Sequence, residues 1–346
     1  MSQPIRFALA GYGAWGKYHA QAIRSTPGCE LTAICAASEA TRESASHDTG
    51  ARTFSSLEEL LANSDADGVD IVAPNYMHEE LACEAFRHGK HVLLEKPMST
   101  SIEACDRIIE ASRAAGKVLL VGHEMRFSGL YSEMKRILDT GRLGDVRYVI
   151  IDLWRRPYRS GSGGWRLDPK RVGNWILEEP VHFFDIASWY LERCGAPASV
   201  FAYGNSMDVA HPRDPDTADN LTVLFNYPNG AYAVISHSLA AVEHHLSIKL
   251  FGSKALLRAE WHAELDRSEA PAFNLTISED GAMQPLDVPS TPGEIFELRQ
   301  EIAAMAAAIR DGAPLPVTPE EARRAVVLCL EARRSLEEGK PVFLLR

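Results

Sequence analysis

The sequence predicts an α/β fold with two domains, in which a parallel sheet enclosed by helices is followed by an α+β domain built on mostly antiparallel strands. Its 346 residues are more than one ordinary core holds. As far as residue 122, short apolar strands alternate with helical stretches, which is typical of a parallel sheet covered on both faces. Further on, apolar and polar residues alternate, which indicates antiparallel strands with one face solvated or partnered. We therefore expect residues 1–122 to form one domain and residues 123–346 the other.

The elements of the first domain are expected in alternation. The apolar stretch IRFALA opens it as a buried strand, and Pro27-Gly28 ends the helix that follows. The remaining strands are expected at residues 31–37, 69–74, 91–97 and 118–122. The helices are expected near residues 17–26, 57–63, 78–89 and 102–116.

The second domain is expected to begin with a helix over 127–141 and a strand at 146–153. A loop rich in Arg, Gly and Trp follows, and Pro180 suits the first position of a helix over about 180–192. Alternating stretches then predict the strands of the sheet, at residues 199–206, 220–227, 230–239, 246–252 and 254–260. Two helices near 294–312 and 319–339 lie toward the end of the chain.

Composition limits the classes of function. The chain is 46% hydrophobic and 24% charged, as in soluble globular proteins, and no apolar run approaches the roughly 20 residues that span a bilayer. The N-terminal residues lack the pattern of a secretory signal, and the six cysteines include no CxxC pair, so we expect reduced thiols in the cytoplasm. A net charge of −11 argues against a nucleic-acid or membrane partner.

The motif GYGAWG lies between the first strand and its helix, where a GxGxxG motif binds a dinucleotide rather than only making a turn. Gly11 is expected to make the tight turn, Gly13 to let the backbone approach the pyrophosphate, and Gly16 to let the helix pack on the strand. Ala14 and Trp15 lie between the last two glycines and are expected to contact the cofactor. The helix N-terminus would then bind the phosphates, which predicts a Rossmann domain.

The sequence favours NADP over NAD as the dinucleotide. An NAD site usually has an acidic residue about 20 positions after the motif, and this chain has Ala36 there. Ser38 and Arg42 are placed to receive a 2′-phosphate, whereas Glu39 would repel one if it faced inward. NAD remains the alternative.

Two further stretches carry residues suited to catalysis. Lys96 lies near the end of the predicted strand HVLLEKP. Ligands bind at the carboxyl ends of strands in such a sheet, although a strand end that is merely exposed to solvent would have the same sequence pattern. His182 lies in the first turn of the helix that Pro180 begins, where it could be a proton-transfer group or a capped core histidine. Glu178 is near enough in sequence to orient its imidazole.

Together these stretches resemble the glucose–fructose oxidoreductase, inositol dehydrogenase and MocA (Gfo/Idh/MocA) family over nearly the whole chain. The resemblance rests on GYGAWG, on APNYMHEELACEAFRHGKHVLLEKP (73–97), on GRLGDV (141–146), and on WRLDP followed by the histidine helix. It implies a Rossmann domain, then an α+β domain with a large open sheet, and an active site between them.

The resemblance also implies roles for individual residues. Lys96, with its neighbours Glu95 and Pro97, would contact cofactor and substrate hydroxyl, while Pro74, Asn75 and His78 would lie near the nicotinamide. Where the family has an aspartate four residues before the histidine this chain has Glu178, and it has Pro180 in place of a glycine; Asp185 follows the histidine by three. Oxidation of a secondary alcohol needs a group that takes the hydroxyl proton, and His182 suits this role, with Lys96 polarising the oxygen.

The loop DLWRRPYRSGSGGWR is unusually rich in arginine and aromatic residues. Guanidinium groups match carboxylate, sulfonate or phosphate oxygens, which favours an anionic sugar derivative as substrate over a merely solvated loop. The residues expected to contact the substrate, besides His182, are Arg155, Arg156, Tyr158, Arg159, Trp165 and Arg166.

No metal site is expected, because HExxH is absent and His244-His245 has no cysteine or carboxylate cluster beside it. The leading hypothesis is an NAD(P)-dependent dehydrogenase of sugars, polyols or sugar derivatives that forms a homodimer or homotetramer. Two others remain: an NAD-dependent glycosidase that oxidises its substrate only transiently, and a cofactor-sensing regulator without catalysis.

Overall fold

The computed structural model describes residues 3–156, 161–206, 219–265 and 267–344, and the chain divides into two compact units. Unit 1 consists of Met1–Glu124, Gly161–Gly173 and Leu298–Val326, and unit 2 of Met125–Ser160, Asn174–Glu297 and Val327–Arg346. Two segments from far beyond residue 122 thus pack with the first sheet. Within the described ranges, no helix is long and apolar enough to cross a membrane.

Unit 1 contains a sheet of six strands that are all parallel, in the order β3-β2-β1-β4-β5-β6. The chain builds outward from β1 to β3 and then returns to the other side of β1, so the order reverses between β1 and β4. Ligands bind at such a reversal, outside the carboxyl ends of the strands. The strands are β1 (Ile5–Ala10), β2 (Cys29–Cys35), β3 (Arg52–Phe54), β4 (Gly68–Ile71), β5 (His91–Glu95) and β6 (Leu119–Gly122).

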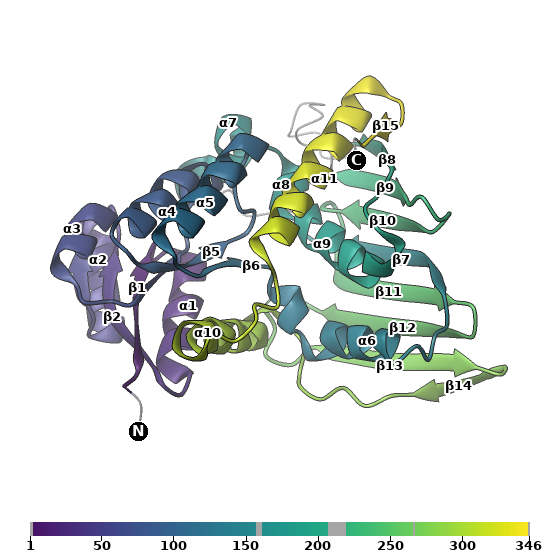
Figure 1. Ribbon diagram of the computed structural model, residues 1–346, viewed down its shortest axis with the longest axis horizontal. Helices are drawn as coiled ribbons and strands as arrows, with labels where there is room; N and C mark the ends of the chain where they lie inside the picture. Colours follow the sequence, from purple (N-terminus) through teal and green to yellow (C-terminus); the bar gives the residue numbers. More distant parts are fainter. Residues whose placement is uncertain (1–2, 157–160, 207–218, 266, 345–346) are drawn as a thin grey trace. The chain divides into compact units, whose positions relative to one another are not determined.

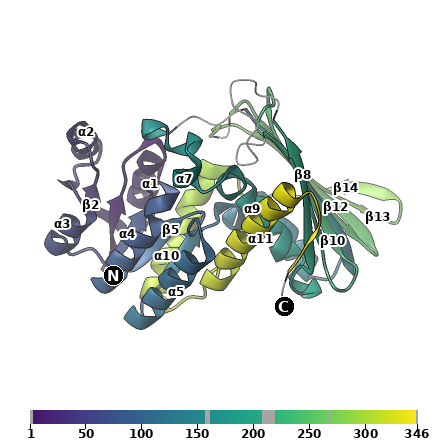
Figure 2. The ribbon, with the colours of Figure 1, turned by 90° about the horizontal axis from the view of Figure 1, so that it is seen from above.

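Helices connect these strands, and α4 and α5 lie side by side on one face of the sheet, with α1 on the other (Figures 1 and 2). Most of α10 (Glu294–Asp311) also belongs to this unit, where Arg299 donates to the Ser25 carbonyl at the end of α1. The connecting helices are α1 (Ala14–Ser25), α2 (Glu39–Thr49), α3 (Leu57–Asn63), η1 (Asn75–Met77), α4 (His78–Arg87) and α5 (Ile102–Ala115). Unit 1 further holds η3 (Ser162–Leu167), α7 (Pro169–Val172) and the beginning of α11 (Pro319–Glu338).

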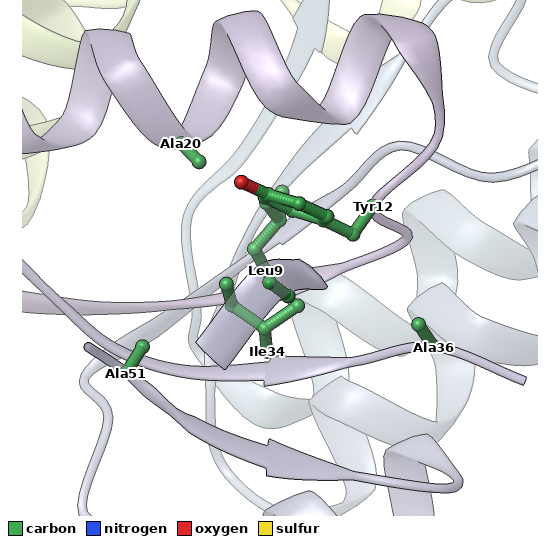
Figure 3. Close-up of a cluster of buried hydrophobic side chains, with 7 residues drawn as sticks. Leu9, Tyr12, Ala20, Ile34, Ala36 and Ala51 are labelled. Carbon is green, nitrogen blue, oxygen red and sulfur yellow. The ribbon is translucent and has the colours of Figure 1, made fainter. Parts of the chain in front are cut away.

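Tyr12 anchors the glycine loop in the core of unit 1. Its ring lies between Leu9, Ala20 and Ile34, in a cluster that also includes Ala36, Ala45 and Ala51 (Figure 3). The Tyr12 hydroxyl lies 3.2 Å from an Asp48 carboxylate oxygen, and burial raises the pKa of Tyr12 to about 12. The second residue of GYGAWG therefore has a packing role that the motif itself does not require.

Unit 2 contains a sheet of nine strands in the order β14-β13-β12-β11-β7-β10-β9-β8-β15. Of the pairings between neighbouring strands, only β7 with β10 is parallel. The predicted mostly antiparallel sheet is therefore confirmed. Its strands are β7 (Val146–Trp154), β8 (Ser199–Asn205), β9 (Asn220–Asn226), β10 (Tyr232–Ser238), β11 (His244–Gly252), β12 (Ala255–Ala263), β13 (Ala272–Glu279), β14 (Ala282–Pro285) and β15 (Val342–Phe343).

The two faces of this sheet differ in burial. Along β7, Val149, Ile151 and Leu153 are fully buried on the face that α9 packs against, whereas the residues between them are less buried. On that second face Tyr148 stacks between Tyr232 and Phe251, with ring centroids 4.3 and 4.9 Å apart. The helices and short turns of unit 2 are η2 (Glu124–Phe127), α6 (Gly129–Asp139), α8 (Trp175–Glu178), α9 (Pro180–Tyr190) and η4 (Glu192–Cys194).

Candidate active site

The three motif glycines occupy positions that only glycine fits or that open the backbone to a ligand. Gly11 has φ +109°, and a Cβ there would lie 2.1 Å from the Val72 carbonyl oxygen. A Cβ at Gly16 would lie 2.2 Å from the Gly11 carbonyl oxygen, so a side chain would push α1 away from the strand. Nothing lies within 4 Å of a Cβ at Gly13, which precedes α1 without any side-chain cap. The backbone N–H groups at the start of α1 are therefore available to the pyrophosphate of a dinucleotide.

The carboxyl end of β2 is where the adenosine ribose of such a cofactor binds. Arg42 Nη1 donates to the carbonyl oxygens of Ala36 and Ala37, at 2.8 and 2.7 Å, and these bonds hold the guanidinium at the strand end. The Ser38 side chain caps α2 by accepting from the Thr41 N–H. A shallow cavity of about 550 Å³ beside them is lined by Glu39, Arg42, Glu43, Ser46, His47 and Thr53. Arg42 thus shares this surface with two carboxylates.

The ends of β4 and β5 lie next to each other, because these strands are paired in parallel. His78 joins the segments after them: its Nδ1 lies 2.8 Å from the Pro97 carbonyl oxygen and its Nε2 lies 2.9 Å from that of Ala73. Asn75 is buried, and its Nδ2 donates to the Val172 carbonyl oxygen. These contacts bring four of the residues predicted to contact the cofactor, namely Pro74, Asn75, His78 and Pro97, to one edge of the sheet, with Lys96 half-buried beside them.

A buried charge network lies beneath this edge. His19 Nδ1 lies 2.8 Å from Asp70 Oδ2, and His19 Nε2 lies 3.0 Å from Glu95 Oε1. The indole of Trp15 donates to the same Glu95 oxygen at 2.8 Å, and Glu95 Oε2 accepts from the Lys96 backbone N–H at 3.2 Å. Trp15 and Glu95 were predicted only as cofactor contacts, and His19 and Asp70 were not predicted as part of the site. A carboxylate within the apolar strand VDIVAP was the available signal.

Burial disfavours the charged form of the His19 imidazole, but the carboxylates of Asp70 and Glu95 raise its pKa well above the ordinary value. Burial would also raise the pKa of Glu95, yet the His19 and Trp15 hydrogen bonds and the Lys96 charge lower it. At neutral pH the network therefore contains an imidazolium and an ionised Glu95.

The segment 161–173 brings further side chains to unit 1. Trp165 is buried, and the Arg166 guanidinium lies 5.0 Å from the centroid of its ring. Arg171, which the sequence analysis did not single out, stacks on Tyr76 at 5.1 Å and donates to its hydroxyl at 3.2 Å. Tyr76 follows Asn75 directly, so this segment reaches the predicted nicotinamide end of the sheet.

The predicted histidine helix is α9, and it begins at Pro180 as expected. His182 and Glu178 are both buried, the latter at the end of α8. Asp185 forms a buried ion pair with Arg126, whose Nε and Nη2 donate to its two carboxylate oxygens at 2.7 and 2.6 Å. The first turns of α9 are thus fixed on unit 2 by a charge pair.

The arginines of the loop after β7 have different surroundings. Arg155 is buried and forms an ion pair with Glu179 at 2.9 Å. Arg156 is exposed, and its Nε donates to the Val242 carbonyl oxygen at 3.1 Å. Tyr158 and Arg159, also predicted to contact the substrate, lie outside the described residues. The Arg155 guanidinium thus neutralises a buried carboxylate.

The described part of the chain holds no group of three or more His, Cys, Asp or Glu side chains placed to bind a metal ion.

The amino-acid sequence matches two models of one family. Residues 5–123 match the oxidoreductase family model with an NAD-binding Rossmann fold, and residues 131–258 match the GFO/IDH/MocA C-terminal domain. The chain belongs to the Gfo/Idh/MocA oxidoreductase family. The resemblance, the fold class and the dinucleotide-binding Rossmann domain are confirmed.

Individual members of the Gfo/Idh/MocA family show how similar the chain is to its relatives. Inositol 2-dehydrogenase of Rhizobium meliloti strain 1021 is 28% identical over 352 residues, which cover 98% of this chain and 99% of the relative. The 1,5-anhydro-D-fructose reductase of Ensifer adhaerens is 30% identical over 188 residues, 54% of this chain and 56% of its own. The crystal structure of GenD2 from gentamicin A biosynthesis, in complex with NAD, has the same fold, with a TM-score of 0.84 at 22% identity over 100% of this chain and 98% of that one.

Proposed function

We propose that this protein is an NAD(P)-dependent oxidoreductase that moves a hydride between the nicotinamide and a secondary hydroxyl of a sugar, a polyol or an anionic sugar derivative. The main support for the proposal is one edge of the six-stranded sheet. There the glycine loop follows β1, Asn75 follows β4 and Lys96 follows β5. The glycine loop leaves its backbone open beside the start of α1, and Lys96 directly follows β5, which supports a cofactor and a substrate hydroxyl at this edge.

The bound dinucleotide would accept or supply the hydride. In the oxidative direction, Lys96 would hold the substrate hydroxyl by hydrogen bonding and stabilise negative charge on its oxygen. His182 would take the hydroxyl proton, since an imidazole exchanges protons near neutral pH. The buried Glu178 would orient that imidazole.

The substrate class follows from the relatives and from the arginines together. Inositol 2-dehydrogenase and 1,5-anhydro-D-fructose reductase are named for a polyol and a sugar derivative, which supports a polyhydroxylated ring. Arg156 and Arg166 support a negative group on that ring, because a guanidinium fork matches the oxygens of a carboxylate or phosphate.

We propose NADP as the preferred cofactor. Arg42 is held at the end of β2 beside Ser38, and no carboxylate stands at Ala36 to accept from the ribose hydroxyls. Glu39 in the first turn of α2 is exposed, and the proposal requires it to point away from the 2′-phosphate.

We also propose that the face of the nine-stranded sheet bearing Tyr148, Tyr232 and Phe251 is covered by a second copy of the chain. A stacked aromatic row on a sheet face is suited to burial against another surface. Light scattering at micromolar concentration should therefore show a homodimer or homotetramer, and a monomer would contradict this part of the proposal.

The experiment that tests the function is a panel of sugars, polyols and sugar acids with NAD or NADP, read as absorbance at 340 nm. Steady formation of reduced cofactor with a free sugar or polyol is the expected result. Cleavage of a glycoside with no net reduction would indicate the redox-neutral glycosidase instead. Cofactor binding without turnover of any compound would indicate a cofactor sensor.

A further inference from the structure

The charge network around His19 connects two motifs that are 80 residues apart in the sequence. Asp70 of β4, His19 of α1 and Glu95 of β5 are all buried, with His19 and Asp70 fully so. Glu95 Oε1 accepts from His19 and from Trp15, which both lie in α1, while its Oε2 accepts from the Lys96 backbone N–H. One carboxylate thus contacts the first turn of α1, the middle of that helix and the backbone of the residue proposed for catalysis.

A network of this kind is costly unless every charge has a partner, because burial removes the hydration of each ion. Two carboxylates without the imidazole between them would repel each other, and one would take up a proton. His19 is therefore the residue that keeps Glu95 charged and in one orientation. A core histidine needed only for packing would not require a carboxylate on each ring nitrogen.

We propose that His19 is a positioning residue for Lys96, acting through Glu95 to fix the lysine relative to the first turn of α1, directly after the glycine loop. The inference rests on the proposed function, because it assigns His19 to the placement of the group that holds the substrate hydroxyl. His19 itself contacts neither cofactor nor substrate in this proposal.

The test compares wild type with His19→Gln. The glutamine carries no charge, and its side-chain amide can replace at most one of the two contacts that the ring nitrogens of His19 make. Ser25→Ala is the matched control, since it removes a hydrogen bond of the same helix, from the Ser25 hydroxyl to the Ala22 carbonyl oxygen, without touching Glu95. Three quantities are measured on the full chain: kcat at 340 nm, the Kd of the cofactor by fluorescence, and the rate at which acetic anhydride acylates Lys96. Acylation is normalised to Lys90, which precedes the same strand, and requires no substrate.

In His19→Gln we expect kcat to fall about ten- to a hundredfold, the size of effect that a displacement near 1 Å produces. The Kd of the cofactor should change much less than kcat. Acylation of Lys96 relative to Lys90 should rise several-fold, because a loosened Glu95 no longer restrains the lysine. Ser25→Ala should match wild type in all three.

His19→Gln with wild-type kcat and wild-type acylation would overturn the inference, as would equal losses of kcat and cofactor affinity with unchanged acylation. If His19→Gln does not fold, the double variant His19→Gln/Asp70→Asn removes the cation together with one carboxylate, and the same outcomes apply. If wild type turns over no compound, the proposed function fails, while the acylation of Lys96 still decides whether His19 positions it.

Discussion

The two sheets of this protein carry their candidate functional residues in different ways. In unit 1 every strand is parallel and helices lie on both faces (Figure 1), so most of its candidate side chains lie at the carboxyl ends of the strands. In unit 2 helices cover one face, and His182 comes from α9, a helix that packs on β7 and β10. The parallel sheet thus has its candidate residues mainly at one edge. In unit 2 the candidate residue His182 comes instead from a helix that covers one face of the sheet.

The buried histidines show the same contrast. His19 lies between two carboxylates, which raise its pKa despite burial. His237 in β10 is equally buried, but neither ring nitrogen has a hydrogen-bond partner among the described residues, and burial lowers its pKa to about 4. The Arg155 charge lowers that pKa further, while Glu179 opposes the shift. Unit 1 therefore stabilises a buried cation at its functional edge, and unit 2 keeps its buried imidazole neutral.

The largest expected effect is a difference in kcat between variants at the two ends of β5. Lys96 follows the carboxyl end of β5 and Lys90 precedes its amino end. Lys96→Met should lower kcat by about 10²–10⁴-fold, because it removes a group that acts on the hydroxyl in the transition state. Lys90→Met should leave kcat near wild type, although Lys90 loses its bond to the Ala66 carbonyl. Equal losses in both variants, measured at 340 nm, would remove the functional distinction between the two ends.

The neutral His237 predicts a pH dependence of stability. Its folded pKa of about 4 lies below the ordinary 6.5, so below pH 6.5 the unfolded chain binds more protons than the folded one. The free energy of unfolding should therefore fall as pH decreases, by about 2 kcal/mol between pH 6.5 and pH 5 at about 1.4 kcal/mol per pKa unit. Urea unfolding of His237→Leu at pH 7 and pH 5 should lack this contribution. A variant with the same pH dependence as wild type would show that His237 is not the cause.

A smaller effect should distinguish the arginines of the loop after β7. Arg156→Ala and Arg166→Ala should each raise KM for an anionic substrate about ten- to a hundredfold, since a charged hydrogen bond contributes about 1.5–3 kcal/mol. Arg155→Ala should instead lower stability, because it leaves Glu179 buried without its charge partner. Kinetics with a sugar acid and with its neutral analogue measure the difference. Unchanged KM in both Arg156→Ala and Arg166→Ala would indicate a neutral substrate.

The smallest expected effect concerns cofactor preference. Ala36→Asp should shift the ratio of kcat/KM for NADP and NAD toward NAD, by about tenfold or more, because a carboxylate repels the 2′-phosphate and accepts from the ribose hydroxyls. Arg113→Ala, which removes an exposed ion pair with Glu320 elsewhere in unit 1, is the control. A wild type that already prefers NAD strongly would contradict the role assigned to Arg42.

Local sequence pattern was sufficient for much of this description. Most strands of both sheets, the glycine loop and the start of α9 at Pro180 follow from strand alternation, glycine spacing and helix-start preference, which act over a few residues. The strands β3, β13 and β14 and the helix α2 were not predicted. The partners of His19 could not be predicted in this way, because they lie 51 and 76 residues away and meet it only in the folded sheet. The pairing of Arg155 with Glu179 and the packing of Arg171 on Tyr76 depend likewise on tertiary contacts. For the same reason the loop arginines could not be distinguished from one another by sequence pattern.

The most direct test of the proposed function follows the hydride itself. Wild-type protein would be incubated with NADP or NAD and an inositol or sugar derivative that carries deuterium on its carbinol carbons, and the nicotinamide would be analysed by mass spectrometry. The account predicts deuterium in the reduced nicotinamide of wild type and almost none in Lys96→Met over the same time. Conversion of the substrate with no deuterium entering the nicotinamide would contradict it.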